Sequence, residues 1–338
     1  MRKELVWVAV IGIAIGLVVA FGVYRINASI KSKIPKVQET PAPVKGSSEF
    51  KITLDKPENG DVLTDDTVTV SGITKSLAWI TVSGEDGDYI IQSDEKGVFG
   101  QDVPLSPGVN QIKLTAFDPN GAQSTEKVLV VYSSSFEEKT VETPIPSEAT
   151  GESAIRDRVN QKVSEALNKP KAYLGVVTDI TDSTIQIKTL ESEIKQVSVG
   201  AEEITVVNSK GTANKAVKLT DIAIGDFIVA MGYINSNSVL VAQRILITDP
   251  VTEPKISAAL GNVTDVTKKT LSVSGIKSSE SSTISPDTKT TFESFQGGKV
   301  AKAKLADISK DDLIIYVNLA GESSSLVRSI FIVAHSQG

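Results

Sequence analysis

The hydrophobic positions of this chain follow three patterns. An unbroken apolar run extends from Leu5 to Tyr24, apolar and polar residues alternate in short runs at about 51–133 and 172–335, and a helical spacing occurs between Ile155 and Leu167. Alternation with period two predicts β-strands, whereas apolar positions at i, i+4 and i+8 predict a helix. We therefore expect a mainly β protein with an apolar helix at its start and a short amphipathic helix near its middle.

The apolar run from Leu5 to Tyr24 contains no charged residue. A helix of this length spans about 30 Å, the thickness of the hydrocarbon core of a bilayer. Trp7 and Tyr24 stand near its ends, as interfacial aromatic residues do. We expect residues 5–24 to form a transmembrane helix that contacts the lipid bilayer. The alternative is a cleaved secretory signal, but the apolar part of such signals is usually about 7–15 residues long.

Basic residues flank this run on both sides, and more of them follow it: Arg25, Lys31, Lys33 and Lys36, against Arg2 and Lys3 before it. Counted strictly, the positive-inside rule would leave the large domains in the cytoplasm. Long domains, however, translocate largely regardless of charge, and the composition that follows is that of a surface protein. We expect the C-terminal domains to be extracytoplasmic, held off the cell membrane by a linker at 31–50.

Short alternating runs fill residues 51–133, with turn residues between them about every 8–12 positions, as in a β-sandwich. The runs are Lys51–Leu54, Thr67–Val70, Trp79–Val82, Gln111–Thr115 and Lys127–Val131. The motifs around them are Pro57-x-Asn59-Gly60, Val70-Ser71-Gly72, Asp94-x-x-Gly97-x-Phe99, Leu105-x-x-Gly108-x-Asn110 and Ala116-x-Asp118. In their order these motifs resemble bacterial immunoglobulin-like domains of cell-surface and secreted proteins. The resemblance implies an immunoglobulin-like sandwich, a fold that serves as spacer, adhesive unit or carbohydrate-associated accessory.

Two acidic loops in this segment could offer oxygen ligands to calcium. One contains Asp118 and Asn120, and the other is Glu85-Asp86-Gly87-Asp88. Neither has the spaced acids and closing bidentate glutamate of a full calcium loop. The favoured interpretation is solvated turns closed by side-chain hydrogen bonds, so no metal site is predicted.

A second linker and a short helix are predicted at 134–171. The apolar stripe of the helix is formed by Ile155, Val159, Val163, Ala166 and Leu167. It covers less than two heptads, which is too short to hold a coiled coil alone. We expect the stripe to pack on the following domain.

An internal repeat occupies the rest of the chain. The segment Leu174–Thr181 returns as Leu260–Thr267, Val217–Ile222 returns as Ala303–Ile308, and each copy closes with an apolar strand, Gln243–Ile247 and Arg328–Ile332. Matched offsets over this length indicate two copies of one fold. A small copy removes its open edges most simply by closing into a barrel, so we expect barrels at 172–248 and 258–335.

The Leu219-x-Asp221-Ile222-x-x-Gly225-Asp226 segment resembles small OB-like bacterial barrel modules of unknown function found in exported proteins. The second copy has Lys310-Asp311 where the first has Ile224-Gly225, which predicts an altered turn. The domain boundaries expected for the whole chain are 1–30 for the anchor, 31–50 for the linker, 51–133 for the sandwich, 134–171 for the second linker and helix, and 172–248 and 258–335 for the two barrels.

The composition limits the kinds of functional site that the chain can contain. The net charge is −6, there is no cysteine, and the only histidine is His335. A basic nucleic-acid binder is not expected, and Lys299, Lys302 and Lys304 are interpreted as a solvated strand edge. His335 beside Ser336 stands in a tail expected to be mobile and solvated. Glycine loops for nucleotide phosphates do not occur, so no catalytic residue, cofactor or metal is predicted, although paired carboxylates stay open.

The sequence therefore predicts a single-pass, membrane-anchored envelope protein without enzymatic activity. Its extracytoplasmic β domains would act as spacers or as binding and adhesion modules towards envelope polysaccharide or a protein partner. The alternative is a carbohydrate-binding accessory protein or a carbohydrate-active enzyme of the cell envelope, which rests on the proteins in which such immunoglobulin-like domains occur.

Overall fold

The computed structural model describes residues 50–136, 169–200, 204–211, 214–253, 255–276, 281–296, 298–320 and 325–335. All of them belong to one compact unit that begins at Phe50. The predicted transmembrane helix at 5–24 and the predicted amphipathic helix at 155–167 lie outside the described residues.

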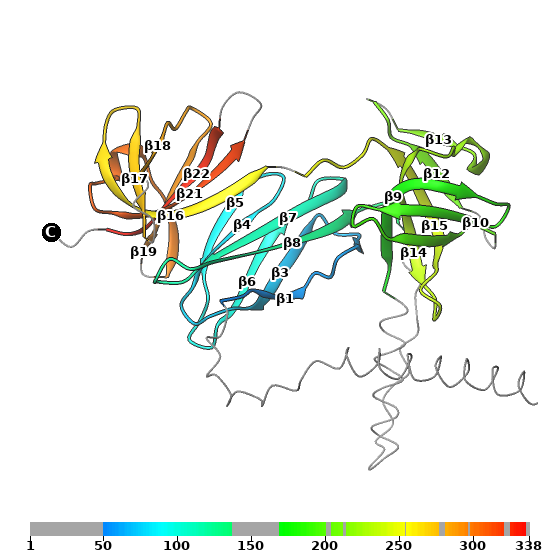
Figure 1. The fold of residues 1–338 in the computed structure, drawn as a ribbon, viewed down its shortest axis with the longest axis horizontal. Coiled ribbons are helices and arrows are strands. Elements are labelled where there is room, and N and C mark those ends of the chain that lie inside the picture. Colours follow the sequence, from blue (N-terminus) through cyan, green and yellow to red (C-terminus); the bar gives the residue numbers. More distant parts are fainter. Residues whose placement is uncertain are drawn as a thin grey trace, which may run out of the picture. The chain divides into compact units, whose positions relative to one another are not determined.

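Residues 50–133 form a sandwich of two sheets around one core (Figure 1). One sheet has the order β1 (Thr53–Lys56), β3 (Thr67–Ile73), β6 (Val98–Pro104). The other has the order β2 (Asp61–Leu63), β8 (Gln123–Tyr132), β7 (Gly108–Phe117), β4 (Trp79–Ser83), β5 (Asp88–Gln92). Alternating residues of both sheets fill the core, including Val70, Phe99 and Leu114. The predicted immunoglobulin-like sandwich is confirmed.

The strands of the first repeat close a ring (Figure 1). Its order is β9 (Lys171–Ile180), β10 (Thr184–Thr189), β11 (Ile194–Ser198), β15 (Leu240–Thr248), β14 (Phe227–Ile234) and back to β9. The β11–β15 pair is parallel, and the hairpin of β12 (Thr205–Asn208) and β13 (Lys215–Val217) is added to β15. The ring encloses an apolar core that includes Val197, Ile228 and Ile245.

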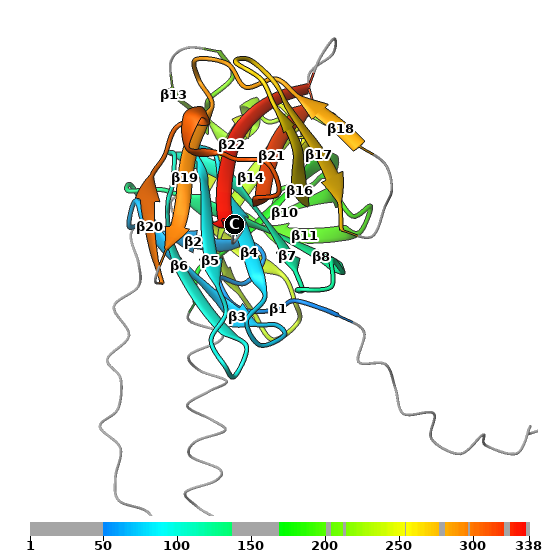
Figure 2. The same ribbon diagram turned by 90° about the vertical axis from the view of Figure 1, so that its left-hand side faces the viewer.

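The second repeat forms an open sheet of seven strands. Its order is β18 (Ser281–Ile284), β17 (Leu271–Gly275), β16 (Ile256–Val266), β21 (Leu313–Ala320), β22 (Ser325–Ala334), β19 (Thr291–Gln296), β20 (Lys299–Lys302). Figure 2 shows β18 and β20 at opposite edges. In the first repeat β11 pairs with β15, but among the described residues β18 forms no equivalent pair with β22.

The tandem repeat is confirmed by matching backbone details. The strand register shifts beside Thr178 in the first copy and beside Thr264 in the second, and each threonine hydroxyl donates to a carbonyl of the next strand. Each copy also has a 3₁₀ turn that begins after a lysine, η1 (Leu219–Asp221) and η2 (Leu305–Asp307). In both turns the aspartate carboxylate accepts the backbone N–H of that lysine at 2.8 Å.

The predicted fold class is wrong in its two matching barrels, and the described residues form strands without either predicted helix. In the described part of the chain the only helical turns are η1 and η2, and no helix there is long and apolar enough to cross a bilayer. Only the first repeat closes, because β11 pairs with β15 as well as with β10, whereas among the described residues β18 pairs with β17 alone. The expected tandem of OB-like barrels is therefore not confirmed.

The modules are also less separate than predicted. Strand β2 of the sandwich pairs with β9 of the first repeat at Asp61 and Lys171, so one sheet of twelve strands runs through both modules. Backbone hydrogen bonds beside this pair join Ala172 N–H to the Gly60 carbonyl at 2.7 Å and Val62 N–H to the Pro170 carbonyl at 3.2 Å.

The predicted difference between the turns at Gly225 and Asp311 is wrong. Both residues adopt a left-handed backbone, with φ of 95° and 69°. Both N–H groups donate to the equivalent strand carbonyl, Gly225 to Val177 at 2.9 Å and Asp311 to Val263 at 2.7 Å. The fold imposes the same turn on an aspartate, which tolerates this conformation better than most residues but less well than glycine.

Replacing Asp311 by glycine is expected to stabilise the second repeat by about 1 kcal/mol, because it removes left-handed strain. Gly225→Ala in the first repeat is expected to destabilise by about 1–2 kcal/mol for the converse reason. Chemical denaturation followed by circular dichroism measures both changes. Gly100→Ala, at a glycine of β6 with open space around it and no positive φ, is the control and should have little effect. A loss of stability in Asp311→Gly would contradict the prediction.

Candidate functional site

Apolar clusters join the sandwich to both repeats. One contains Val62 and Val131 of the sandwich with Leu174, Val229 and Met231 of the first repeat. The other contains Ile90 and Phe117 of the sandwich with residues of the second repeat: Ile256, Ala258, Leu260, Ile315, Val317, Phe331 and Val333. Both repeats therefore use the outer faces of the same three strands, β9, β14 and β15 in the first and β16, β21 and β22 in the second, to cover apolar surface of the sandwich.

A buried carboxylate ties the sandwich to the first repeat. The side chain of Asp61 is 2 % exposed, and its two oxygens lie 2.8 Å from the ammonium groups of Lys169 and Lys171. Lys171 also lies 2.6 Å from the carboxylate of Glu58. Burial alone would lower the pKa of Lys171, but its hydrogen bonds to Asp61 and Glu58 outweigh burial and raise the pKa. The same hydrogen bond from Lys171 lowers the pKa of Glu58.

A second buried carboxylate ties the sandwich to the second repeat. The side chain of Asp88 in β5 is fully buried and accepts a hydrogen bond from the Ser329 hydroxyl at 2.6 Å. The guanidinium of Arg328 lies 3.4 Å from the same carboxylate and donates to the Gly84 carbonyl at 3.0 Å. Each junction thus combines an apolar cluster with a charge that is paired across it.

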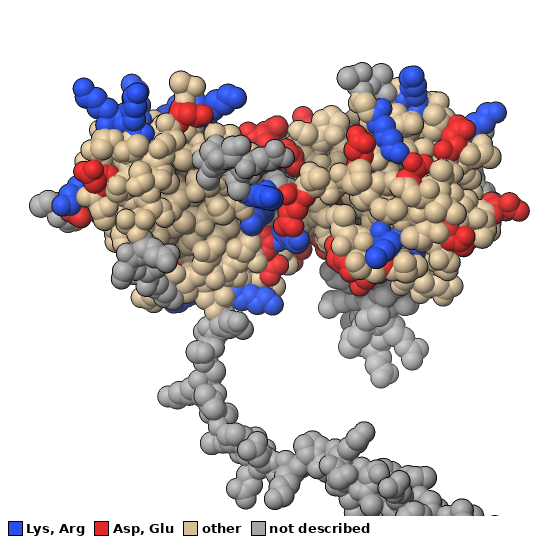
Figure 3. Space-filling view, turned by 45° about the horizontal axis from the view of Figure 1, so that its top comes forward, with Lys and Arg blue, Asp and Glu red and all other residues tan. Residues whose placement is uncertain are grey.

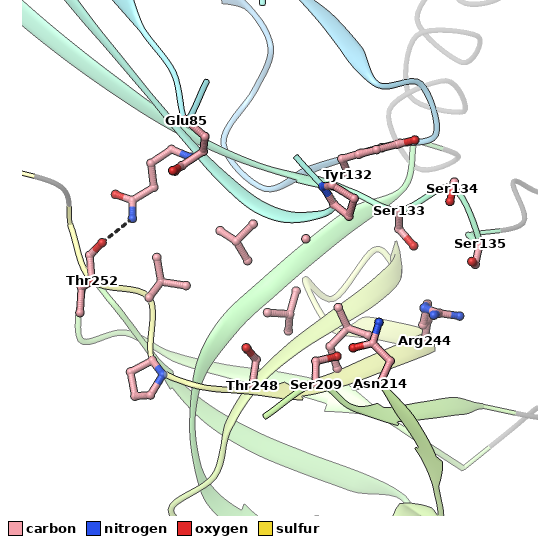
Figure 4. Close-up of a pocket in the computed structure, with 18 residues that line it drawn as sticks. Glu85, Tyr132, Ser133, Ser134, Ser135, Ser209, Asn214, Arg244, Thr248 and Thr252 are labelled. Atoms are coloured by element: carbon pink, nitrogen blue, oxygen red, sulfur yellow. Dashed lines mark hydrogen bonds between the residues drawn. The ribbon is translucent and has the colours of Figure 1, made fainter. Parts of the chain in front are cut away.

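A groove of about 650 Å³ lies between the sandwich and the first repeat (Figure 4). Tyr132 and the following serines lie on its sandwich side, and Ser209, Asn214, Arg244 and Thr248 lie on its repeat side (Figure 4). The apolar lining residues are Val109, Val229, Leu246 and Val251. Its described ionic side chains are Glu85 and Arg244.

The side chains that line this groove can form several kinds of non-covalent contact. Hydroxyl and amide side chains can donate and accept hydrogen bonds, the guanidinium can pair with an anion, and apolar residues can contact a ring face. Glu85 is the one carboxylate among the described lining residues, whereas hydrolysis of glycosides uses two.

Neither acidic loop is arranged as a metal site: the loop at Asp118 lies apart from the groove, and the other loop contributes only Glu85 to the groove lining. One oxygen of Asp118 accepts the N–H groups of Asn120 and Ala122, and the other lies 3.0 Å from the Lys75 ammonium. Burial would raise the pKa of Asp118, but these partners outweigh it and lower the pKa. In the second loop Asp88 is held by Arg328 and Ser329. The described residues contain no group of three or more acidic, histidine or cysteine side chains placed to hold a metal.

His335 does not lie in a free tail, contrary to the prediction. Its ring Nδ1 lies 3.1 Å from a carboxylate oxygen of Asp312, which is almost fully buried. The same oxygen accepts the N–H of Ser309, and the equivalent Asp226 of the first repeat accepts the N–H of Ala223. Asp226 pairs with Lys210 at 2.7 Å, and this hydrogen bond, with that from Ala223, lowers the pKa of Asp226. The two aspartates therefore hold equivalent turns, one beside the Lys210 ammonium and the other beside the His335 ring.

The lysines at 299, 302 and 304 do not form part of the groove. Lys299 and Lys302 are exposed on β20, which is the outermost strand of its sheet. On the face shown in Figure 3, acidic and basic side chains are interspersed.

Sequence reasoning missed the groove and the two junctions. One signal was present, because Gln243 and Arg244 interrupt the apolar residues of the strand Leu240–Thr248. The partners that surround Arg244 come from distant segments, so no local pattern shows them together.

In the comparison with known protein families, only the sandwich matches a family model. Residues 50–133 match the family model of glucodextranase, domain B. This match covers less than half of the chain. A search of curated proteins finds no match.

Solved structures with some similarity include a 1.5-MDa bacterial ice-binding adhesin, 13% identical over 86% of this chain and 98% of that chain, with a TM-score of 0.20. A Ca²⁺-stabilised adhesin of an Antarctic bacterium is 14% identical over 86% and 75%, with a TM-score of 0.18. PorU from Porphyromonas gingivalis is 10% identical over 84% and 34%, with a TM-score of 0.21. TM-scores this low do not establish a common fold.

Lys171→Met is expected to lower the free energy of unfolding by about 2 kcal/mol, because Asp61 stays buried with Lys169 as its remaining cation. Urea denaturation at pH 7 measures this loss. Lys188→Met, at an exposed lysine of β10, is the matched control and should change stability little.

The effect of Lys171→Met should depend on pH in a defined direction. The pKa of Lys171 is raised on folding, so its contribution is complete below about pH 10.4 and is lost as the pH rises through the higher folded value. The difference from wild type should therefore shrink at strongly alkaline pH. A difference that grows with alkaline pH would contradict the assignment.

Proposed function

We propose that this chain is a non-catalytic spacer and binding unit of a bacterial cell envelope, with its β modules outside the cytoplasm. The observation that carries the proposal is the construction of the junctions. Each junction buries apolar side chains and a paired carboxylate, as the interior of a single domain does. A spacer needs such junctions, because a flexible link would not hold a binding surface at a fixed position.

The two junctions are well suited to keep the modules fixed. A buried carboxylate that loses its partner costs several kcal/mol, so movement that separates Asp61 from Lys171 or Asp88 from Arg328 is opposed. The backbone hydrogen bonds of Val62 and Ala172 would also break. Movement at either junction would in addition expose apolar surface to water.

A role without catalysis is supported by the chemistry of the groove. It brings one carboxylate, one guanidinium and several hydroxyl groups together, and no histidine lies in its described lining. Such a set binds polar ligands but has no pair of groups for general acid and base catalysis. The location outside the cytoplasm is part of the same proposal, and protease treatment of intact cells tests it.

A carbohydrate-binding accessory role is the second candidate. The observation in its favour is the match of residues 50–133 to domain B of a glucodextranase, an enzyme named for its action on a glucan. Sedimentation of the full chain with insoluble α-glucan, followed by analysis of released sugar, tests this candidate. Retention on the glucan without released sugar supports it, and released sugar would contradict the absence of catalysis.

The spacer role predicts narrow distances between modules. Because the chain has no cysteine, two introduced cysteines are the only sites for spin labels. The pairs Lys96→Cys with Lys188→Cys and Lys96→Cys with Lys268→Cys join exposed positions of the sandwich to each repeat. Electron–electron resonance on the full chain should give a single narrow distance distribution for both pairs.

The pair Lys96→Cys with Thr125→Cys, within the sandwich, sets the width expected for one rigid module. Distributions between modules should be about as narrow, and Lys171→Met should broaden the pair that spans the first junction. Broad distributions in the unmodified junctions would refute the spacer role.

A further inference from the structure

The two repeats place different side chains at one equivalent position. Arg244 of β15 lies opposite Thr205 of β12, and Ser329 of β22 lies opposite Thr291 of β19 in the same parallel arrangement. Both positions belong to the strand that faces the sandwich. A serine in one copy and an arginine in the other therefore meet the same kind of surroundings.

Ser329 has a hydrogen-bond partner in the sandwich, whereas the Nε atom of Arg244 has none there among the described residues. Ser329 donates to the buried carboxylate of Asp88 at 2.6 Å. The Nε atom of Arg244 is buried and has no hydrogen-bond partner among the described residues. An unpaired buried donor of a charged group is costly, and natural proteins rarely leave one unsatisfied.

The Arg244 side chain lines the groove, and the described residues beside it include no carboxylate that corresponds to Asp88. Asn214 and Ser209 lie beside Arg244 on the repeat side, and Ser133–Ser135 lie across from them (Figure 4). Glu85 lies at the other end of the groove in the same view (Figure 4). The end of the groove at Arg244 therefore favours an anion, and the hydroxyl groups around it favour a polar, hydrogen-bonding ligand.

The size and the mixed lining limit the class of ligand further. A volume of about 650 Å³ lies within the usual range of ligand pockets, about 300–1,000 Å³. Tyr132 and Leu246, which are both partly exposed, offer apolar surface of the kind that contacts the faces of sugar rings. A single guanidinium suits one carboxylate, whereas a ligand with several phosphates would need more cations.

We propose that this groove binds an acidic saccharide, with a uronic acid carboxylate paired to Arg244 and the sugar hydroxyls bound by the serine, threonine and asparagine side chains. The inference rests on the proposed role as a binding unit and names the ligand class for it.

Calorimetric titration of the full chain with two matched disaccharides tests this proposal. Digalacturonate and galabiose have the same linkage and differ in the carboxylate or hydroxymethyl group at C6. Digalacturonate should bind at least tenfold more tightly than galabiose, and its affinity should fall as salt concentration rises. Equal affinity for the two sugars, or no binding of digalacturonate, would overturn the proposal.

Variants at Arg244 test whether digalacturonate binds in the groove. Arg244→Gln should reduce the affinity for digalacturonate at least tenfold, to the level of galabiose, and Arg244→Ser, which copies the second repeat, should do the same. Lys188→Gln, an exposed cation on β10 outside the groove, is the control and should bind as the wild type does. Thermal unfolding of each variant checks its fold, and neither change at Arg244 should lower the melting temperature, since both remove a buried Nε donor that has no partner among the described residues.

Two further outcomes decide the ligand class and separate it from the spacer role. Inorganic phosphate that binds as tightly as digalacturonate would show a simple anion site and overturn the saccharide assignment. Unchanged digalacturonate binding in both Arg244 variants would place the site elsewhere and also overturn it. Narrow spin-label distances with no sugar binding would leave the spacer role standing and remove only the groove's ligand.

Discussion

The association of the sandwich with the first repeat depends on one buried carboxylate. Asp61 is the strand residue through which β2 meets β9, and its two oxygens are held by Lys169 and Lys171 from the other module. A carboxylate this deeply buried is stable only while its cations stay in place. The contact between β2 and β9 is therefore fixed by this pairing of charges.

The second copy of the internal repeat also packs against the sandwich. The two copies share strand order through most of their length, the same bulges, the same 3₁₀ turn and the same left-handed turn before the apolar strand. They also turn equivalent strands to the sandwich. What differs is how the charges at that face are paired: Asp88 of the sandwich satisfies the second copy, whereas Arg244 of the first copy faces a groove. The duplicated module thus contacts the sandwich in two ways, one with a buried charge pair at this position and one with a groove beside it.

The sequence predicted correctly those strands and turns that depend on residues close together in the chain. Period-two alternation located the strands, and the motifs around Gly60, Gly97 and Gly108, which all have positive φ, marked real turns. The repeat was visible because matching residues serve matching backbone roles. Closure of the second copy was predicted wrongly, since it depends on whether a short polar strand such as β18 can pair with a distant strand. The turn at Asp311 was also misjudged, because the fold imposes a left-handed backbone that the residue itself does not indicate. The groove and the junctions join residues more than a hundred positions apart, and no pattern along the chain brings them together.

Hydrogen exchange at the amides that cross the first junction tests the central claim most directly. The N–H groups of Val62 and Ala172 donate across the junction to Pro170 and Gly60. A fixed junction predicts that both amides are protected as strongly as those in the core strands β7 and β14, and that Lys171→Met reduces this protection selectively. Rapid exchange of these two amides in the wild-type chain, with the core strands still protected, would contradict a rigid connection between the modules.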